Sequence, residues 1–297
     1  MIKVRVPATS ANMGPGFDSL GVAASLYNEF GFRVTEGGLT FKGFLEEFCN
    51  EDNIVYTSMV KCFKRANVKV PGLEISELKQ DVPVSRGLGS SSTCIVAGLV
   101  AANEILGNKF SKDEIFEMSV EIEGHPDNVA PAVFGGMVVS VMDGKEVYFD
   151  KVNIKKDFKL VPVVPNFRLS TSEARSVLPT SISMKDGVYN LSRAALMVSA
   201  LTNGRLDLLK HACTDSFHEN YRSKLIKGFD EVREEAYRLG ALASYLSGAG
   251  PTIMALVDKD DNEFAHNMQA FLKKKSLEWT IFELSIDTLG AVVIGEK

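Results

Sequence analysis

Cysteine, tryptophan and histidine are scarce in this 297-residue chain, which contains four, one and four of them. The cysteines, Cys49, Cys62, Cys94 and Cys213, form no CxxC pair and lie at no zinc-ligand spacing from histidine. The chain is long enough to bury a sizeable core without covalent crosslinks. We therefore expect reduced, mostly buried thiols rather than a disulfide framework or a structural zinc site.

Long hydrophobic runs are also absent. The longest apolar stretch, Cys94–Ala102, is far shorter than the ~18 residues that a membrane span requires. The N-terminal letters MIKVRVPATSANMG lack the apolar region of a secretory signal. These absences predict a cytoplasmic protein without a membrane partner.

An excess of positive charge is the third missing feature. The chain has 33 basic and 38 acidic residues, a formal charge of −5. A nucleic-acid partner is not expected, because such binding needs a basic surface. The hydrophobic and charged fractions, 45% and 24%, are those of an ordinary globular protein. The sequence leaves open whether two copies of the chain associate as a homodimer.

Strand-like and helical patterns alternate along the chain and predict an α+β protein. Strands are expected at 2–6, 30–34, 136–141, 146–149, 159–164, 241–246, 252–257, 280–284 and 291–294. Helices are expected at 53–66, 91–106, 111–122, 182–201, 206–216, 229–238 and 263–274. The polar stretch at 150–157 separates two apolar runs, so we place a domain boundary between residues 155 and 156. The predicted domains are therefore 1–155 and 156–297.

The strongest local signal is the segment PVSRGLGSSS at 83–92, which leads directly into an apolar helix. Its two glycines allow a tight turn and the close approach of a ligand. The serines can cap the helix, and the first N–H groups of the helix can bind an anion. No lysine follows the second glycine, so this is not a Walker P-loop. The pattern indicates a phosphate cradle, and an ordinary serine-capped helix is the alternative.

Two further glycine-containing loops follow strand-like runs. The first, PATSANMGPGFD at 7–18, contains Asn12 and Asp18, which could contact a polar ligand. The other, SGAGPT at 247–252, lets the backbone approach either a ligand or another element closely. By itself, each loop fits a plain turn equally well.

Acidic, imidazole and amide groups gather in the segment EIEGHPDN at 121–128. Gly124 and Pro126 are expected to end the preceding helix there. The carboxylate of Glu123 could hold Mg²⁺, which takes one or two carboxylates together with substrate phosphates. Solvated carboxylates and a packed His125 are the alternative. Taken with the three loops, this segment favours phosphoryl transfer, which depends on positioning and charge neutralisation.

These segments together resemble the GHMP kinases, the family of galactokinase, homoserine kinase, mevalonate kinase and phosphomevalonate kinase. The loop at 87–92 within its 83–93 frame resembles their second motif, and SGAGPT their third. PATSANMGPGFDSLG, GHPDNVAPAVFGG, STSEARSVLP and FHENYRSKLIKGFDEV resemble the forms found in homoserine kinases. The pieces run from residue 7 to residue 252 in the order of the family.

The resemblance implies a GHMP kinase fold, with an N-terminal domain like ribosomal protein S5 domain 2 and a C-terminal ferredoxin-like domain. It implies ATP-dependent phosphorylation of L-homoserine to O-phospho-L-homoserine, a step of threonine biosynthesis, with ATP and Mg²⁺ bound. The backbone that would wrap the ATP phosphates comprises Pro83, Val84, Ser85, Arg86, Gly87, Leu88, Gly89, Ser90, Ser91, Ser92 and Thr93. Mg²⁺ would be held by Glu123 and a hydroxyl among the three serines, for which we choose Ser91.

The resemblance also assigns the substrate side. Asn12, Asp18 and His125 would contact homoserine, with Gly248 and Gly250 closing the site. Arg175 and Arg222 would hold the α-carboxylate, a role that suits a planar, bidentate donor.

Asp127 and Asn128 occupy the positions of a DN pair whose aspartate serves some family members as a base on the substrate hydroxyl. We favour positioning over a strong base, with both residues as organisers of the site. Two alternatives to the substrate and the activity stay open. One is a GHMP kinase for another alcohol, such as mevalonate or a diphosphocytidyl sugar alcohol. The other is a non-catalytic metabolite sensor on the same fold.

Overall fold

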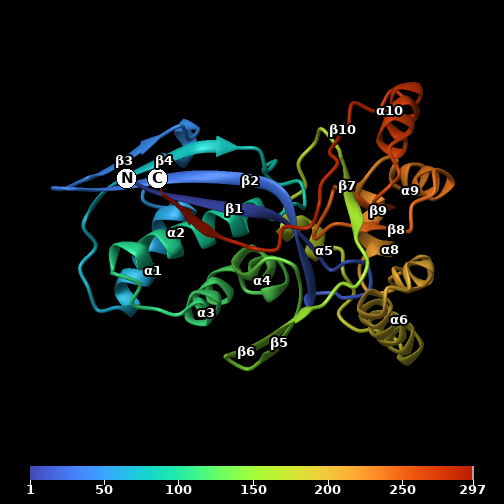
Figure 1. Cartoon of the computed structure of the whole chain (residues 1–297), viewed down its shortest axis with the longest axis horizontal. Coiled ribbons are helices and arrows are strands. Elements are labelled where there is room, and N and C mark those ends of the chain that lie inside the picture. Colours follow the sequence, from blue (N-terminus) through green and yellow to red (C-terminus); the bar gives the residue numbers. More distant parts are fainter. Residues whose placement is uncertain (296–297) are drawn as a thin grey trace.

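The computed structural model describes residues 1–295 and contains two β-sheets with helices packed against them (Figure 1). The N-terminal half and the C-terminal half lie at opposite ends of an elongated molecule. Helices and strands mix within each half, which confirms the predicted α+β class.

The first sheet has seven strands in the order β11-β1-β2-β4-β3, with the β5–β6 hairpin pairing to β2. All pairings are antiparallel except that of β3 with β4. The strands are β1 (Ile2–Ala11), β2 (Leu20–Thr35), β3 (Leu39–Lys42), β4 (Gly72–Gln80), β5 (Met137–Asp143), β6 (Glu146–Val152) and β11 (Val292–Ile294).

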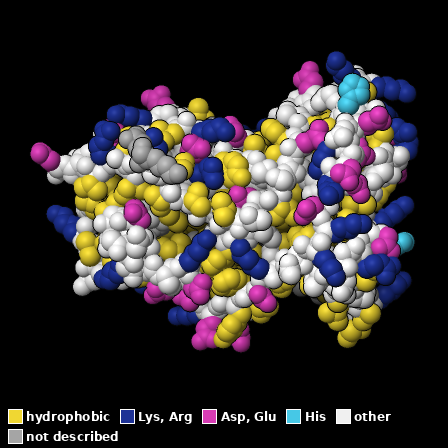
Figure 2. Space-filling model, viewed as in Figure 1, with side chains coloured by type: hydrophobic (Ala, Val, Ile, Leu, Met, Phe, Trp, Pro, Cys, Tyr) yellow, Lys and Arg dark blue, Asp and Glu magenta, His cyan; other side chains and the backbone are white. Residues whose placement is uncertain are grey.

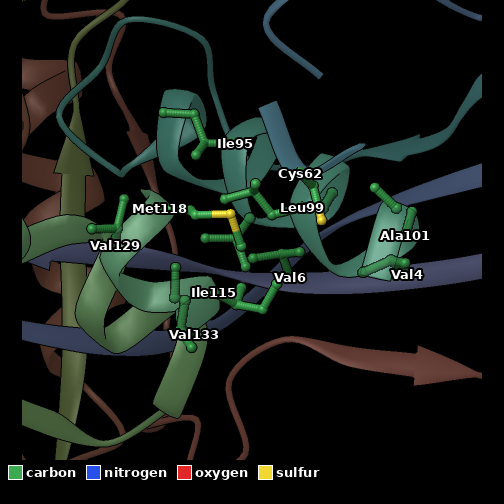
Figure 3. Packing of buried hydrophobic residues seen from close by; sticks show 14 of the residues in the cluster. Val4, Val6, Cys62, Ile95, Leu99, Ala101, Ile115, Met118, Val129 and Val133 are labelled. Carbon is green, nitrogen blue, oxygen red and sulfur yellow. The ribbon is translucent and has the colours of Figure 1, made fainter. Parts of the chain in front are cut away.

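Four helices cover one face of this sheet: α1 (Ile54–Arg65), α2 (Ser90–Ile105), α3 (Lys112–Glu123) and α4 (Pro126–Phe134). Their apolar side chains form a buried core with those of the strands (Figure 3). Gly98 lets α2 approach α1, because a Cβ at this position would lie 2.3 Å from the carbonyl oxygen of Val55. The capping box expected at the start of α3 is present, with Ser111 and Glu114 bonding reciprocally.

The second sheet has four antiparallel strands in the order β10-β7-β9-β8. They are β7 (Phe158–Val164), β8 (Ala243–Leu246), β9 (Ile253–Asp258) and β10 (Thr280–Ile281). The helices of this half are α5 (Thr171–Ser176), α6 (Met184–Asn203), α7 (Leu209–Ala212), α8 (Glu219–Arg222), α9 (Phe229–Arg238) and α10 (Phe264–Lys274). Short 3₁₀ turns occur at Glu46–Phe48, Leu206–Leu208 and Ser223–Leu225. None of the helices within residues 1–295 has the length and apolarity to cross a membrane.

The two halves share a hydrophobic core. Val22 of the first sheet and Leu160 and Met254 of the second belong to the same buried cluster. The last strand, β11, also returns to the first sheet, where Val293 pairs with Val4 of β1. We keep the boundary between residues 155 and 156 as a proposal, with the addition that residues 292–294 lie in the N-terminal sheet.

Most predicted elements are present, and several differ from expectation. The first two strands are longer than predicted, while β3, β4, α4, α5 and α8 were missed. The predicted helix at 206–216 is present only over its first part, as the 3₁₀ turn at Leu206–Leu208 followed by α7. Beyond α7 the Asp215 carboxylate accepts the backbone N–H groups of His218 and Glu219, which fixes a turn in place of a continuing helix.

Candidate active site

One cavity of about 320 Å³ lies where loops of the two halves meet. It brings together residues that are far apart in the sequence, and most of the predicted site residues line it. Those residues are Asn12, Asp18, Val84, Ser85, Arg86, Gly87, Gly89, Ser90, Ser91, Glu123, His125, Asp127, Asn128, Arg175, Arg222, Gly248 and Gly250. The three loops and the acidic segment therefore form a single site.

The entry into α2 differs from the predicted serine cap. Gly89 is the N-cap residue, with φ of 69°, and no side chain caps the helix. The serines at 90–92 occupy the first three helical positions, where backbone N–H groups have no intrahelical acceptor. Uncapped N–H groups at a helix start attract an anion, so this correction strengthens the case for phosphate binding.

Thr9 of β1 contacts the predicted phosphate-binding segment at 83–92, the phosphate loop. Its N–H donates to the carbonyl oxygen of Leu88 at 3.1 Å, and a Cβ on Gly89 would lie 1.9 Å from its hydroxyl oxygen. The same hydroxyl donates to Oδ1 of Asn128 at 2.9 Å. The loop is therefore tied both to the first strand and to the start of α4, and only glycine fits at position 89.

The third glycine loop packs on the phosphate loop, backbone against backbone. Ser247 Oγ donates to the carbonyl oxygen of Gly87 at 2.5 Å, and a Cβ on Gly87 would lie 2.4 Å from the Ser247 carbonyl oxygen. The N–H of Thr252 donates to the carbonyl oxygen of Arg86 at 3.3 Å. From the sequence, this loop could approach either a ligand or another element of the protein. In the structure it contacts another element, the loop at 83–92, and it also lines the cavity through Gly248 and Gly250.

Some residues of the predicted phosphate loop use their side chains elsewhere. The Arg86 guanidinium donates to the carbonyl oxygens of Pro165 and Asn166 at 3.0 and 2.9 Å. The Thr93 hydroxyl donates to the carbonyl oxygen of Ser90. The residues of the loop that do not line the cavity are Pro83, Leu88, Ser92 and Thr93. If these residues or Arg86 contact phosphate, they would therefore do so through backbone atoms. Otherwise they would act only by fixing the shape of the loop.

Ser91 and Glu123 meet at the cavity. Ser91 Oγ donates to Glu123 Oε2 at 3.0 Å, and Ser92 Oγ lies 3.4 Å from Glu123 Oε1. Ser91 is exposed to the cavity and Ser92 is buried. A carboxylate and a hydroxyl at this separation are hard oxygen donors that suit Mg²⁺.

The segment after α3 corrects a second expectation. Gly124 ends α3 with φ of 88°, but Pro126 begins α4 rather than ending a helix. Asp127 therefore lies in the first turn of α4, where its Oδ1 is 2.6 Å from Nδ1 of His125. Burial lowers the pKa of His125, but the hydrogen bond to Asp127 and the nearby carboxylates outweigh burial and leave the pKa raised.

Asn12 and Asp18 also line the cavity, and a carboxylate oxygen of Asp18 lies within 4.8 Å of the ligand atoms of His125 and Asp127. Asn12 has φ of 67°, accepts the N–H of Asp18 on Oδ1 and donates from Nδ2 to the carbonyl oxygen of Gly248, both at 3.0 Å. Arg175 Nη2 donates to Asp18 Oδ1 at 2.8 Å. Arg222 Nη1 donates to the same Gly248 carbonyl oxygen at 3.1 Å. The first and third loops are therefore linked through one carbonyl group.

The two arginines lie over one aromatic ring. The guanidinium carbons of Arg175 and Arg222 are 5.6 and 5.3 Å from the centroid of Phe17. Burial, together with the positive charge of Arg175, lowers the pKa of Arg222 to about 10. Arg222 is 2% exposed, and its hydrogen bonds go to neutral groups. The two guanidinium groups together can bind an anion at this end of the cavity.

The other end of the cavity is apolar and was missed by the sequence reading. It is lined by Phe44, Leu45, Phe48, Ile54, Val55 and Cys94, with Asn53, Glu77 and Gln80 beside them. Burial raises the pKa of the Cys94 thiol to about 12, so this thiol is neutral. These residues come from the segment 44–48, which includes the first 3₁₀ turn, from the start of α1, and from β4 and α2, and no local motif marks them.

Comparison with known proteins agrees with this geometry. The model of the GHMP kinases N-terminal domain matches residues 53–136, and that of the GHMP kinases C-terminal domain matches residues 197–274. The two matched segments make up more than half of the chain. The protein belongs to the GHMP kinase family, and the predicted GHMP kinase fold is confirmed.

Relatives of high sequence identity show to which group of GHMP kinases the chain belongs. A homoserine kinase of Clostridium beijerinckii is 65% identical over 294 residues, 99% of each chain, and one of Clostridium botulinum is 59% identical over the same lengths. The crystal structure of homoserine kinase from Cytophaga hutchinsonii superposes with a TM-score of 0.90 at 29% identity, over 99% of this chain and 97% of the other. A mevalonate kinase structure, at 15% identity and a TM-score of 0.72 over 97% and 100% of the chains, shares the fold. Within the GHMP kinases, the chain belongs to the homoserine kinases.

Proposed function

We propose that the protein transfers the γ-phosphate of ATP to the hydroxyl of L-homoserine, giving O-phospho-L-homoserine and ADP for threonine biosynthesis. The observation that carries this proposal is the cavity itself. Its middle is lined by the loop at 84–91, to which we assign phosphate binding, and one end holds Asp18, Arg175 and Arg222. A small amino acid has an ammonium group and a carboxylate that match these charges, and 65% identity to a homoserine kinase supports the choice of amino acid.

ATP would lie along the cavity from the apolar end to the loop. The apolar residues around Phe44 and Ile54 suit a base, which is recognised by flat apolar surfaces and a few polar groups. The triphosphate would then reach the start of α2, where the N–H groups of the first helical residues are free to bind it. This orientation directs the γ-phosphate towards the charged end.

Glu123 and Ser91 would hold Mg²⁺ beside the phosphates. The ion would neutralise charge on the transferring phosphoryl group, which is the chemistry that a kinase needs from it. Glu123 extends from the end of α3 and Ser91 from the start of α2, so the packing of these helices sets the separation of the two ligands.

Homoserine would replace the ion pair between Asp18 and Arg175. Its ammonium group would bind Asp18, with Asn12 and His125 nearby, and its carboxylate would bind Arg175 and Arg222. Asp18 and Arg175, whose side chains are 2.8 Å apart, would then each pair with the oppositely charged group of the substrate. The side-chain hydroxyl of homoserine would point towards the phosphate loop, with Gly248 and Gly250 closing the site.

The chemistry would rest on positioning and charge stabilisation. A general base contributes about 10²–10⁴-fold, or roughly 3–5 kcal/mol, whereas holding two reactants together can contribute roughly 7–11 kcal/mol. Oδ1 of Asp127 already bonds to His125, and Oδ1 of Asn128 accepts from Thr9. We therefore assign Asp127 and Asn128 to organising the site. The bond from the γ-phosphorus to ADP breaks as the bond to the homoserine oxygen forms, and the hydroxyl proton passes late in a loose transition state to an oxygen of the transferred phosphoryl group.

An alcohol panel tests the function. Release of ADP would be measured with ATP, Mg²⁺ and homoserine, mevalonate or a diphosphocytidyl sugar alcohol. We expect kcat/KM for homoserine to exceed that of the others by at least about 100-fold, because the paired charges of the site discriminate substrates that lack them. A preference for another alcohol would favour the second GHMP activity. Binding of ATP without turnover of any alcohol would favour a sensor.

The same proposal places the enzyme in the cytoplasm with small-molecule partners only, namely homoserine and ATP. It includes neither a nucleic-acid nor a membrane partner. The homodimer that the sequence left open stays a proposal.

A further inference from the structure

A buried histidine lies between the loop at 7–18 and the arginines of the cavity. Figure 2 shows histidine side chains on the surface of the C-terminal half, whereas His218 is 0% exposed. His218 is the N-cap residue of α8 and lies one turn before Arg222. A buried imidazole needs hydrogen-bond partners for its ring nitrogens, and their identity shows what the side chain does.

The two ring nitrogens of His218 face opposite kinds of partner. Nε2 lies 3.0 Å from the carbonyl oxygen of Gly14, which can only accept a hydrogen bond. Nδ1 lies 3.5 Å from Nη1 of Arg222, which can only donate. A single form of the ring satisfies both partners, the neutral imidazole with its proton on Nε2. His218 in this form joins a loop of the first half of the protein to an arginine of the second.

The surroundings of His218 favour the neutral ring. Burial lowers the pKa of His218 and the positive charge of Arg222 lowers it further, and together they outweigh the opposing effects of Asp215 and Asp18. The Asp215 carboxylate lies 3.8 Å from Nε2, too far for a hydrogen bond, and instead accepts the backbone N–H groups of His218 and Glu219. A second proton, on Nδ1, would point at the guanidinium group of Arg222.

The loop that receives the hydrogen bond of His218 has an unusual backbone. Asn12, Met13 and Gly14 have φ of 67°, 45° and 81°, so three consecutive residues lie in the left-handed region. This region is unfavourable for residues other than glycine. Asn12 and Met13 therefore keep their conformation only because surrounding contacts hold the loop.

The C-terminal half holds this loop at three consecutive carbonyl groups. Cys213 Sγ donates to the carbonyl oxygen of Met13 at 3.6 Å, and Asn190 Nδ2 donates to that of Pro15 at 2.8 Å. His218 donates to the carbonyl group between them. Within residues 1–295, His218 is the one of these three donors that also contacts an arginine of the cavity.

Phe17 provides a second link between His218 and the cavity. The rings of Phe17 and His218 are stacked, with centroids 5.2 Å apart and planes inclined by 30°. The guanidinium carbons of Arg175 and Arg222 lie over the same Phe17 ring. Because Asp18 follows Phe17 directly, one imidazole contacts both the segment that carries the cavity carboxylate and the buried arginine.

We propose that His218 is a positioning residue for the amino-acid substrate, fixing the Asp18 loop relative to Arg222 as the Nε2–H tautomer. This inference rests on the proposed function, in which Asp18 binds the ammonium group of homoserine and Arg222 its carboxylate. His218 does not line the cavity, so it acts through these two residues. It sets the separation of the two charges to which homoserine must fit, and leaves the nucleotide and the phosphoryl transfer to other groups.

Steady-state kinetics of two substitutions tests this role. His218→Phe keeps an aromatic ring but removes both nitrogens, and should raise KM for homoserine by about 10–100-fold, the range for a lost buried hydrogen bond. KM for ATP and kcat should change by less than about threefold, because an interaction with the bound amino acid alone is weakened. His218→Gln keeps an N–H that can reach the Gly14 carbonyl oxygen, and should bring KM for homoserine back to within about fivefold of the wild-type value.

Tyr237→Phe is the matched control for a loss of stability alone. The Tyr237 hydroxyl accepts the N–H of Ser244 and lies in the same half of the protein, outside the cavity lining. This variant should lower the midpoint of thermal unfolding and leave both KM values unchanged. If His218→Phe behaved in the same way while the wild type phosphorylated homoserine, the positioning role alone would be overturned. A wild type that did not phosphorylate homoserine would overturn the proposed function and this inference together.

Nitrogen NMR of isotope-labelled histidine tests the tautomer without turnover. The ring signals that are missing from the spectrum of His218→Gln belong to His218. At neutral pH we expect one protonated and one unprotonated nitrogen, with the proton on Nε2. An imidazolium ion, or a proton on Nδ1, would overturn the proposal, and this result would hold even if His218→Phe did not fold.

Discussion

Ser91 and Glu123 lie on different helices, 32 positions apart, and their side chains meet at 3.0 Å beside the first free N–H groups of α2. This contact joins the two parts of the proposed phosphate site, the helix start and the carboxylate. Neither motif alone was decisive, because the proposed magnesium ligands come together only when α2 and α3 have packed.

Glu123→Gln should abolish most activity at ordinary Mg²⁺ concentrations. The amide is a weaker metal ligand than the carboxylate, and loss of one charge-stabilising group at a phosphoryl-transfer site costs about 10²–10³-fold in kcat. Initial rates over a Mg²⁺ titration would measure both the loss and any recovery at high metal concentration. Asp127→Asn is the matched variant and should keep measurable activity. If both variants were equally inactive, a base mechanism through Asp127 would be the better account.

Arg175→Ala should raise KM for homoserine by about 10–100-fold, the range expected when a charge-assisted hydrogen bond is lost. KM for ATP should change little, because Arg175 lies at the Asp18 end of the cavity. Steady-state kinetics with each substrate varied in turn measures the two constants. Arg33→Ala is the control, since Arg33 makes a comparable ion pair with Glu74 on the exposed sheet. An equal rise in both KM values would remove Arg175 from the carboxylate site.

Gly87→Ala should raise KM for ATP at least tenfold. A Cβ there would lie 2.4 Å from one carbonyl oxygen and 2.9 Å from another, so the phosphate loop or the 247–252 loop must shift. Gly107→Ala is matched in φ, at 76° against 77°, but a Cβ at Gly107 meets nothing within 4 Å. The control should lose about 1 kcal/mol of stability and keep its KM for ATP. Equal kinetic effects would show that backbone strain, not contact between the loops, is responsible.

Glu219→Gln should stabilise the protein increasingly as pH rises. Burial raises the pKa of the Glu219 carboxyl, which is 3% exposed, to about 7. The contribution of Glu219 to wild-type stability is therefore fully present below about pH 4.5 and is lost as pH rises through 7. The difference in unfolding free energy between variant and wild type should grow by roughly 3 kcal/mol over that window.

Denaturant unfolding at pH 5 and pH 8 measures the difference. The glutamine side chain keeps an oxygen that can accept the hydrogen bond from the N–H of Leu246. In the wild-type protein the Leu246 nitrogen lies 2.5 Å from Glu219 Oε1. Glu121→Gln is the contrast, because Lys61 and Arg65 leave the pKa of Glu121 lowered against the opposing effect of burial. That variant should be less stable than the wild type by the same amount at both pH values, because the contribution of Glu121 is lost only as pH falls below about 4.5. A pH-independent difference for Glu219→Gln would show that the carboxyl titrates normally in the fold.

Helices with local signals were predictable from the sequence, and long-range strand pairings were less so. The capping box at Ser111 and the apolar spacing of α1 and α2 identified those helices to within a few residues. The strand β2 was found only over 30–34, because Gly21 and Asn28 interrupt its apolar pattern. Both are required by tertiary contacts: a Cβ on Gly21 would lie 1.7 Å from the Asp127 carbonyl oxygen, and Asn28 accepts the N–H of Val82.

The polar half of the site was predictable because its residues occur in short motifs. Asn12, Asp18 and Glu123 all line the cavity, as expected. The apolar half was not predictable, since Phe44 and Cys94 are ordinary hydrophobic residues until the fold places them together. Pro126 was assigned to the wrong end of a helix, because proline is compatible both with stopping one helix and with starting the next.

The central claim is that the turn before α2 binds the triphosphate of ATP through its backbone, between an apolar base pocket and a charged amino-acid pocket. A crystal structure with a non-hydrolysable ATP analogue, Mg²⁺ and homoserine tests it most directly. The account predicts phosphate oxygens within hydrogen-bond distance of the N–H groups at 87–92, Mg²⁺ on Glu123, and the homoserine carboxylate on Arg175. Nucleotide bound elsewhere, with these N–H groups still without a ligand, would contradict it.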